Sequence, residues 1–166
     1  LVLRDYSMRD AARRIAHGKG VNCGQICVAP DYALVPREGM AEFVAAVKDS
    51  FGKLYGPSTQ GSADYTAVAS ERHAARIQHL LNDARAKGAT ITRCGEVAND
   101  RRTPLHIVTD CTPDMTLMQE EIFGPILPVL AYDALDEAIQ HIQNRPRPLA
   151  LYCFSHDAKA RGLVLE

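Results

Sequence analysis

One cysteine stands in a sequence context that could make its thiol a nucleophile. Cys27 lies in the segment 20–30, which follows a predicted helix and precedes a predicted strand. If a short helix begins near Asn22 or Gly24, its free N–H groups and the positive end of its dipole would favour a thiolate at Cys27. The same N–H groups could stabilise an oxyanion on a substrate carbonyl. The alternative is a cysteine packed under the strand, and the residues alone leave both interpretations open.

A second segment, 118–125, carries two adjacent carboxylates, then an aromatic residue and a Gly-Pro pair. Glu120 or Glu121 could accept two hydrogen bonds from a vicinal diol, the group that a ribose offers. Phe123 could pack against a flat ring. The alternative is a solvated acidic helix end followed by a turn, and taken alone the segment favours that alternative.

The cysteines as a set indicate neither disulfides nor a metal. There are five, an odd number, with no secretory pattern, so we expect a reduced, cytoplasmic chain whose cysteines are mostly small buried hydrophobes. No C-x-x-C pair or Cys/His cluster has zinc spacing, and we therefore expect no metal site. Cys23 and Cys27 could form a disulfide only after local rearrangement, so a packing role for Cys23 is the favoured interpretation.

Composition limits the classes of partner. The chain has 166 residues, 46% of them apolar and 23% charged, which suits about one globular domain. A formal net charge of −1 gives no reason to expect nucleic acid or an anionic membrane. No stretch approaches the run of about 18 apolar residues that a membrane helix needs. Because the chain lacks an initiator Met and stops within an apolar run, we expect one domain, 1–166, trimmed at both ends.

Helix and strand patterns alternate along the chain, which predicts an α/β fold with a mainly parallel, twisted sheet flanked by helices. Apolar residues at helical spacing predict helices over 7–18, 40–51, 70–87 and 133–144, with a short one over 115–121. Strands are predicted over 32–35, 89–94, 105–108, 126–131 and 149–154. Pro128 indicates an edge strand or an irregular pairing. The almost wholly apolar segment 149–154 predicts a strand covered on both faces.

Two motifs together carry a resemblance to a known family. They are Asn22-x-Gly24-Gln25-x-Cys27 followed by Ala29-Pro30, and Glu120-Glu121-Ile122-Phe123-Gly124-Pro125 downstream. In this order they resemble the aldehyde dehydrogenase superfamily. The runs 27–32 and 145–152 further resemble its class 3 and coniferyl aldehyde dehydrogenase branch, and the resemblance covers essentially the whole chain. It implies the catalytic domain of an enzyme that oxidises an aldehyde to a carboxylate with NAD or NADP.

The resemblance also implies a role for each matching residue. Cys27 matches the nucleophile, whose thiohemiacetal with the aldehyde becomes a thioester that water hydrolyses. Its backbone N–H matches one arm of the oxyanion hole. Glu121 matches the carboxylate that holds the nicotinamide ribose, and Phe123 matches the aromatic residue that packs near the nicotinamide. Asn22 and Gln25 are interpreted as shaping the loop.

Other parts of the family's pattern do not occur in these residues. The chain contains no Glu-Leu-Gly-Gly segment with the general base, no Gly-rich turn for the cofactor phosphates and no Asn-bearing second oxyanion donor from the cofactor-binding domain. We therefore expect that domain to be absent and the isolated chain to be inactive. The resemblance implies a homo-oligomer for the full-length enzyme. Alternatives are a non-catalytic folded scaffold, or a thiol hydrolase using Cys27, which would need a base, and no histidine lies within the motif.

Several other polar groups are given structural interpretations. His73 and His79 lie six residues apart on a predicted helix and so face different ways, which excludes a ligand pair. The consecutive residues 155–157, Ser-His-Asp, cannot converge as a triad. The segment 18–20, Gly-Lys-Gly, lacks the spacing of a phosphate loop. The pair 101–102, Arg-Arg, is predicted to be an exposed turn.

Overall fold

The position of both motifs is set by a four-stranded sheet. The computed structural model describes residues 1–165, so Glu166, the last residue of the expected domain, lies outside the described residues. The strands are β1 (Ala33–Pro36), β2 (Thr90–Arg93), β3 (His106–Thr109) and β4 (Ile126–Tyr132), in the order β1-β4-β3-β2. Both β1 and β3 pair with β4 in parallel, whereas β2 pairs with β3 antiparallel. The predicted α/β fold with a mainly parallel sheet flanked by helices is confirmed.

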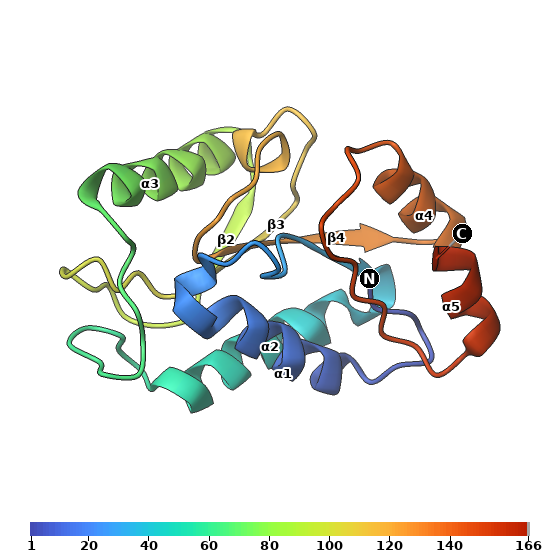
Figure 1. Ribbon diagram of the computed structural model, residues 1–166, viewed down its shortest axis with the longest axis horizontal. Coiled ribbons are helices and arrows are strands. Elements are labelled where there is room, and N and C mark those ends of the chain that lie inside the picture. The colour runs from blue at the N-terminus through green and yellow to red at the C-terminus, as the bar shows by residue number, and fades with distance from the viewer. Residues whose placement is uncertain (166) are drawn as a thin grey trace.

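Helices cover both faces of this sheet. They are α1 (Met8–Gly20), α2 (Met40–Tyr55), α3 (Glu71–Ala86), α4 (Leu135–Gln143) and α5 (Ala158–Leu165), with short 3₁₀ turns η1 (Val21–Gly24), η2 (Arg37–Gly39) and η3 (Thr116–Met118). Figure 1 shows α1 and α2 side by side below the strands, and α3 and α4 above them.

The alternation of side chains along β4 explains this layering. Leu127 and Val129 join the core shared with α1 and α2. Ile126 joins the core formed with α3, and Tyr132 joins the core formed with α4. Because successive residues of a strand point to opposite faces, an apolar strand requires cover on both sides.

Serine side chains cap the starts of α1 and α3. Ser7 accepts a hydrogen bond from the backbone N–H of Asp10 at 3.3 Å, and Ser70 accepts one from that of His73 at 3.1 Å. Each satisfies a donor that the first helical turn leaves unpaired. The predicted helix over 40–51 runs on to Tyr55, where Gly56 with φ 78° ends it.

Pro128 lies in an internal strand, so an edge position is the wrong interpretation. β4 pairs with β3 over 126–128 and with β1 over 129–132, and Pro128 therefore falls where the pairing passes from one neighbour to the other. At this point the strand is paired on one side only, a position that tolerates the missing N–H of proline. The alternative of an irregular pairing describes this arrangement.

The apolar segment 149–154 does not form the predicted covered strand. Only Phe154 pairs, in an isolated parallel bridge with Val2, and Leu149 is 75% exposed. The neighbouring backbone is the segment 1–3, which joins the sheet through the Val2 N–H and the Leu34 carbonyl, 2.9 Å apart. One bridge forms here rather than a ladder. The predicted helix over 115–121 is likewise reduced to η3, and α5 was not predicted.

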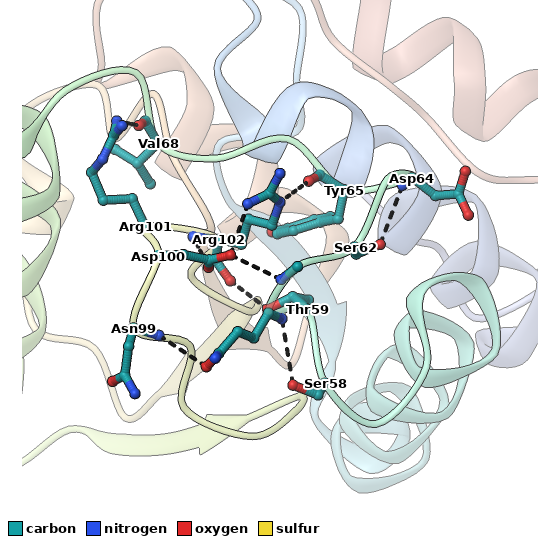
Figure 2. A network of polar contacts seen from close by, with 12 residues as sticks. Ser58, Thr59, Ser62, Asp64, Tyr65, Val68, Asn99, Asp100, Arg101 and Arg102 are labelled. Atoms are coloured by element: carbon teal, nitrogen blue, oxygen red, sulfur yellow. Dashed lines mark hydrogen bonds and ion pairs between the residues drawn. The ribbon is translucent and has the colours of Figure 1, made fainter.

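Two loops without regular structure, 57–69 and 95–103, are joined by polar contacts (Figure 2). The Arg101 guanidinium donates to the Val68 carbonyl at 2.6 Å, and the Val68 N–H donates to the Arg101 carbonyl at 2.9 Å. The Arg102 guanidinium donates to the Tyr65 carbonyl at 3.1 Å and forms an ion pair with Asp100 at 2.7 Å. The pair 101–102 is therefore half-buried and bonded, and the prediction of an exposed turn is wrong.

Candidate active site

The loop that carries Cys27 has an unusual backbone. Asn22, Cys23 and Gly24 have φ values of 49°, 57° and 72°, so three consecutive residues adopt the left-handed region. Glycine takes this conformation without a steric penalty and asparagine tolerates it, whereas a cysteine there is uncommon. The Cys23 side chain is buried in the core shared by α1 and α2, which agrees with its predicted packing role. This loop therefore needs contacts from outside to hold its shape.

The side chain of Gln25 supplies such contacts. Its Nε2 donates to the carbonyls of Asn22, at 2.9 Å, and Ala67, at 3.2 Å, while its Oε1 accepts from the Ala69 N–H at 2.8 Å. The Asn22 side chain in turn donates to the Gln25 carbonyl at 3.1 Å. These bonds match the loop-shaping role expected for Asn22 and Gln25.

Cys27 does not lie at the start of a helix. The short helix is η1, which ends at Gly24, and Cys27 follows in a tight turn closed by the Ala29 N–H and the Ile26 carbonyl at 2.9 Å. The predicted effect of a helix dipole on the Cys27 thiol is therefore wrong. Within residues 1–165 the Cys27 N–H has no hydrogen-bond acceptor, which leaves this donor available to a substrate oxygen.

Exposure separates Cys27 from the other four cysteines. Its thiol is exposed, whereas Cys23 and Cys94 are buried and Cys111 and Cys153 are partly buried. Burial raises the pKa of the Cys23 thiol to about 11 and the pKa values of the Cys94 and Cys111 thiols to about 12, and it also raises that of Cys153. Because the thiolate is the reactive form, the other four thiols are both shielded and protonated at neutral pH.

The loop that carries Glu121 and Phe123 is held by α3. Arg76 donates to the backbone carbonyls of Glu121 and Ile122 at 2.6 and 2.7 Å. The Nε2 of His73 lies 2.7 Å from the Phe123 carbonyl and, because a carbonyl only accepts, this nitrogen carries the proton. Phe123 has φ 49°, a strained value for a bulky residue, and the contact from His73 helps to hold it.

The sequence did not predict these contacts of His73 and Arg76 with residues 121–123. It excluded His73 and His79 as a ligand pair and assigned neither residue another role. Both carboxylates are exposed, but Arg76 pairs with Glu120 at 2.8 Å, which ties that carboxylate to α3 and leaves the Glu121 side chain outside this ion pair. The available signal was the spacing of His73 and Arg76, because residues three apart lie on one face of a helix.

The two loops meet backbone to backbone. A Cβ at Gly24 would overlap the carbonyl of Gly124, so only a residue without a side chain allows this approach. Gly124 is in turn packed against Ile77 of α3. A hydrogen bond from the Ile122 N–H to the Asp31 carboxylate, 3.1 Å long, joins the loops a second time. The resemblance treated the motifs separately, and the structure places them in direct contact.

Lys19 lies beside this contact and is buried, with a side chain that is 1% exposed. Burial lowers its pKa to about 8, and Asp31, Cys23 and Glu121 oppose that shift. It was considered only as part of a failed phosphate-loop pattern. The signal that could have found it is its place on the apolar face of α1, four residues after the buried Ile15.

An open cleft of about 1890 Å³ brings Cys27 and Glu121 together. Phe123, 39% exposed, does not line it, so two of the three predicted site residues share the cleft. Its other walls include α1, α2 and the segment 145–152, and the Tyr152 hydroxyl donates to the Val28 carbonyl at 2.8 Å. Small-molecule pockets enclose roughly 300–1,000 Å³. The cleft is therefore wider than a site that closes around one ligand.

The remaining polar groups have structural partners. The Asp5 carboxylate accepts hydrogen bonds from the Ser155 hydroxyl and from the N–H groups of His156 and Asp157, so the 155–157 segment anchors a loop rather than forming a triad. Within residues 1–165, no group of three or more His, Cys, Asp or Glu side chains is arranged to hold a metal ion. None of the helices in that range has the length and apolar character needed to cross a bilayer.

The sheet is mixed, and its loops bring an exposed thiol and an exposed carboxylate into one cleft. These features define an α/β domain with a candidate thiol site. The chain belongs to the aldehyde dehydrogenase family, whose model matches residues 1–164.

Two relatives and one solved structure illustrate the similarity. A probable coniferyl aldehyde dehydrogenase of Pseudomonas aeruginosa is 46% identical over 166 residues, which are 100% of this chain and 35% of that protein. The dimeric, NADP-preferring aldehyde dehydrogenase of Bos taurus is 41% identical over 165 residues, 98% of this chain and 67% of that sequence. The substrate-bound Staphylococcus aureus AldH structure has a TM-score of 0.91 at 39% identity, covering 99% of this chain and 35% of its own. The chain spans about a third of the length of its first relatives.

We expect iodoacetamide to label Cys27 faster than any other cysteine of the folded chain, by roughly 10-fold or more, because it alone is exposed and the other thiols have raised pKa values. A time course at pH 8 with mass-mapped peptides measures the five rates. In urea the rates should converge, which controls for intrinsic differences. Equal labelling of Cys27 and Cys94 in the folded chain would contradict this interpretation.

The depressed pKa of Lys19 predicts a pH dependence of stability. Between about pH 8 and 10.5 the folded chain has released a proton that the unfolded chain keeps, so the free energy of unfolding should rise with pH in that window. Lys19→Met should be more stable than wild type at pH 7, by up to about 3 kcal/mol, and this advantage should shrink above pH 8. Urea unfolding at several pH values measures it. The exposed Lys53→Met is the control, and a pH-independent gap for Lys19→Met would refute the assignment.

Proposed function

We propose that this chain is the nucleophile-bearing catalytic domain of an NAD(P)-dependent aldehyde dehydrogenase. The observation that carries the proposal is the shared cleft, in which the exposed Cys27 thiol and the Glu121 carboxylate are held together by the contact between Gly24 and Gly124. Membership of the family supports it. The general base and the cofactor phosphate-binding turn would be supplied from outside residues 1–166.

In the proposed reaction the Cys27 sulfur attacks the aldehyde carbon and forms a thiohemiacetal. The Cys27 N–H, which has no acceptor within residues 1–165, would donate to the oxygen as its negative charge develops. The oxidised nicotinamide of NAD or NADP, when bound, would supply the acceptor for the hydride that leaves this carbon. The thioester left on Cys27 is hydrolysed to the carboxylic acid, which releases the thiol.

The residues present fit the nicotinamide half of the cofactor. Glu121 would accept two hydrogen bonds from the ribose diol, because Arg76 holds its backbone and leaves its side chain exposed. Phe123, with its exposed ring, would pack near the nicotinamide. This ribose is common to NAD and NADP, so these residues suit both cofactors, and the Bos taurus relative is named NADP-preferring.

The proposed substrate is an aromatic or aliphatic aldehyde. The cleft that holds Cys27 has both charged and apolar side chains in its lining, and the apolar ones, including Val28, Leu149 and Leu151, would desolvate an apolar substrate. The coniferyl aldehyde dehydrogenase name of the Pseudomonas aeruginosa relative supports an aromatic one. We also propose a cytoplasmic homo-oligomer. The five free cysteines support a reducing compartment, and the name of the Bos taurus relative describes a dimer.

Cys27→Ala in the complete gene product that carries this sequence should lower kcat by on the order of 10⁴-fold, because the nucleophile is lost. Glu121→Gln should lower kcat/KM by about 10- to 100-fold through weaker ribose binding. NAD(P)H formation with benzaldehyde, coniferyl aldehyde and hexanal measures both. Cys153→Ala and Glu120→Gln are the matched controls, expected within about 3-fold of wild type. A Cys27→Ala enzyme that keeps full activity would disprove the proposed role.

The isolated 166-residue chain should form no NAD(P)H with the same aldehydes. The proposed reaction needs a base to activate water and a turn to bind the cofactor phosphates, and the chain contains neither motif. Circular dichroism of the same sample shows whether the chain is folded. Sustained turnover by the folded chain would mean that its own residues supply the missing groups.

A further inference from the structure

The Cys27 loop depends on a neighbour that has no regular structure of its own. Gln25, a side chain only 9% exposed, bonds the loop to the segment 67–69, using the Ala67 carbonyl and the Ala69 N–H. The segment 67–69 lies in neither a helix nor a strand, so no ladder of its own fixes its backbone. The position of the Cys27 loop is therefore only as well defined as that of the residues to which Gln25 is bonded.

Arg101 fixes this segment from the other side. It exchanges two hydrogen bonds with Val68, the residue between Ala67 and Ala69: the side chain donates to the Val68 carbonyl at 2.6 Å, and the backbone carbonyl accepts from the Val68 N–H at 2.9 Å. Figure 2 shows the Arg101 side chain extended toward Val68. Arg101 has φ 63°, a left-handed conformation that allows both its side chain and its carbonyl to reach the same residue.

A second set of contacts joins the two residues that follow Arg101 to Tyr65 and Cys23. Arg102 donates to the Tyr65 carbonyl at 3.1 Å, and the Tyr65 hydroxyl donates to the Thr103 carbonyl at 3.0 Å. The Cys23 sulfur, in the left-handed turn before Cys27, lies 3.8 Å from the same Thr103 carbonyl. The segment 101–103 thus contacts the Cys27 loop both directly, at Cys23, and through the segment 65–69.

We propose that Arg101 is a positioning residue for the Cys27 nucleophile, acting through Val68 and Gln25 and touching neither substrate nor cofactor. The inference rests on the proposed function. His73 and Arg76 hold the Glu121 loop, whereas Arg101 holds the Cys27 loop. Arg101 also forms an ion pair with Glu71, the first residue of α3, at 2.8 Å, but the Glu71 side chain is 86% exposed, and exposed ion pairs stabilise little. The two catalytic loops would therefore depend on different supports.

This difference predicts a selective kinetic defect. In the complete gene product, Arg101→Met should lower kcat by roughly 10- to 100-fold, the scale of misplacing a reacting group by about 1 Å. The KM for the cofactor should stay within about 2-fold, because His73 and Arg76 still hold the Glu121 loop and the ion pair that Arg101 makes to Glu71 of α3 is exposed. Arg101→Lys should restore part of kcat, since an ammonium can still donate to the Val68 carbonyl. In a Gln25→Leu background, which already lacks the link, Arg101→Met should change kcat by less than about 2-fold.

Hydrogen exchange tests the same link without activity. The Ala69 N–H, whose acceptor is Gln25, should exchange faster in Arg101→Met than in wild type. The increase in its exchange rate should exceed any increase expected from a lower melting temperature of the variant. Arg37→Met, which removes an exposed ion pair to Asp133, is the matched control and should alter neither readout. If the wild-type protein shows no dehydrogenase activity but Ala69 still exchanges faster in Arg101→Met than in wild type, the proposed function is refuted and the structural link is supported. The positioning role would be overturned if Arg101→Met changed neither kcat nor Ala69 exchange. It would also be overturned if the kcat loss of the double variant equalled the product of the losses of Arg101→Met and Gln25→Leu.

Discussion

The approach of Gly24 to Gly124 is the contact on which the candidate site depends. These residues are 100 positions apart, and they come close enough that a single methyl group at Gly24 would overlap the opposite carbonyl. No interaction between side chains could bring the two loops nearer. Because the thiol follows one glycine by three residues and the carboxylate precedes the other by three, the contact itself sets the separation of the two groups.

The surrounding elements can be understood as supports for that contact. α3 packs Ile77 against Gly124 and uses His73 and Arg76 to hold the carbonyls of residues 121–123. α1 ends at the left-handed turn and contributes the buried Lys19, whose charge lies near acidic groups from both loops. A buried ammonium lowers stability unless opposite charges balance it, so Lys19 is a cost that the arrangement of Asp31 and Glu121 partly offsets.

Sequence patterns predicted those parts of the structure that local physics determines. The apolar faces of α2 and α3 and the four strands follow from the periodicity of apolar residues, which involves neighbours in the chain. The motifs singled out Cys27 and Glu121 as candidates because a family resemblance carries residue types and order. Predictions were wrong where contacts with distant segments determine the local structure. The segment 149–154 makes only one bridge, to the distant Val2. Pro128 depended on where β4 changes partners, and Arg101 has a structural role because Val68 lies opposite.

The same distinction explains why Cys27 rather than another cysteine can react. A helix dipole was the expected means of activation, and the turn that actually holds Cys27 offers no such dipole. The difference in reactivity arises instead because the other four thiols are made unreactive: the fold buries Cys23 and Cys94 and raises the pKa of every thiol other than that of Cys27. Exposure alone leaves a thiol only moderately nucleophilic, so under the proposed function an activating base would approach from the open side of the cleft. The wide cleft and the unassisted thiol are therefore consistent with each other: both leave the face above Cys27 accessible to the groups that would complete the site.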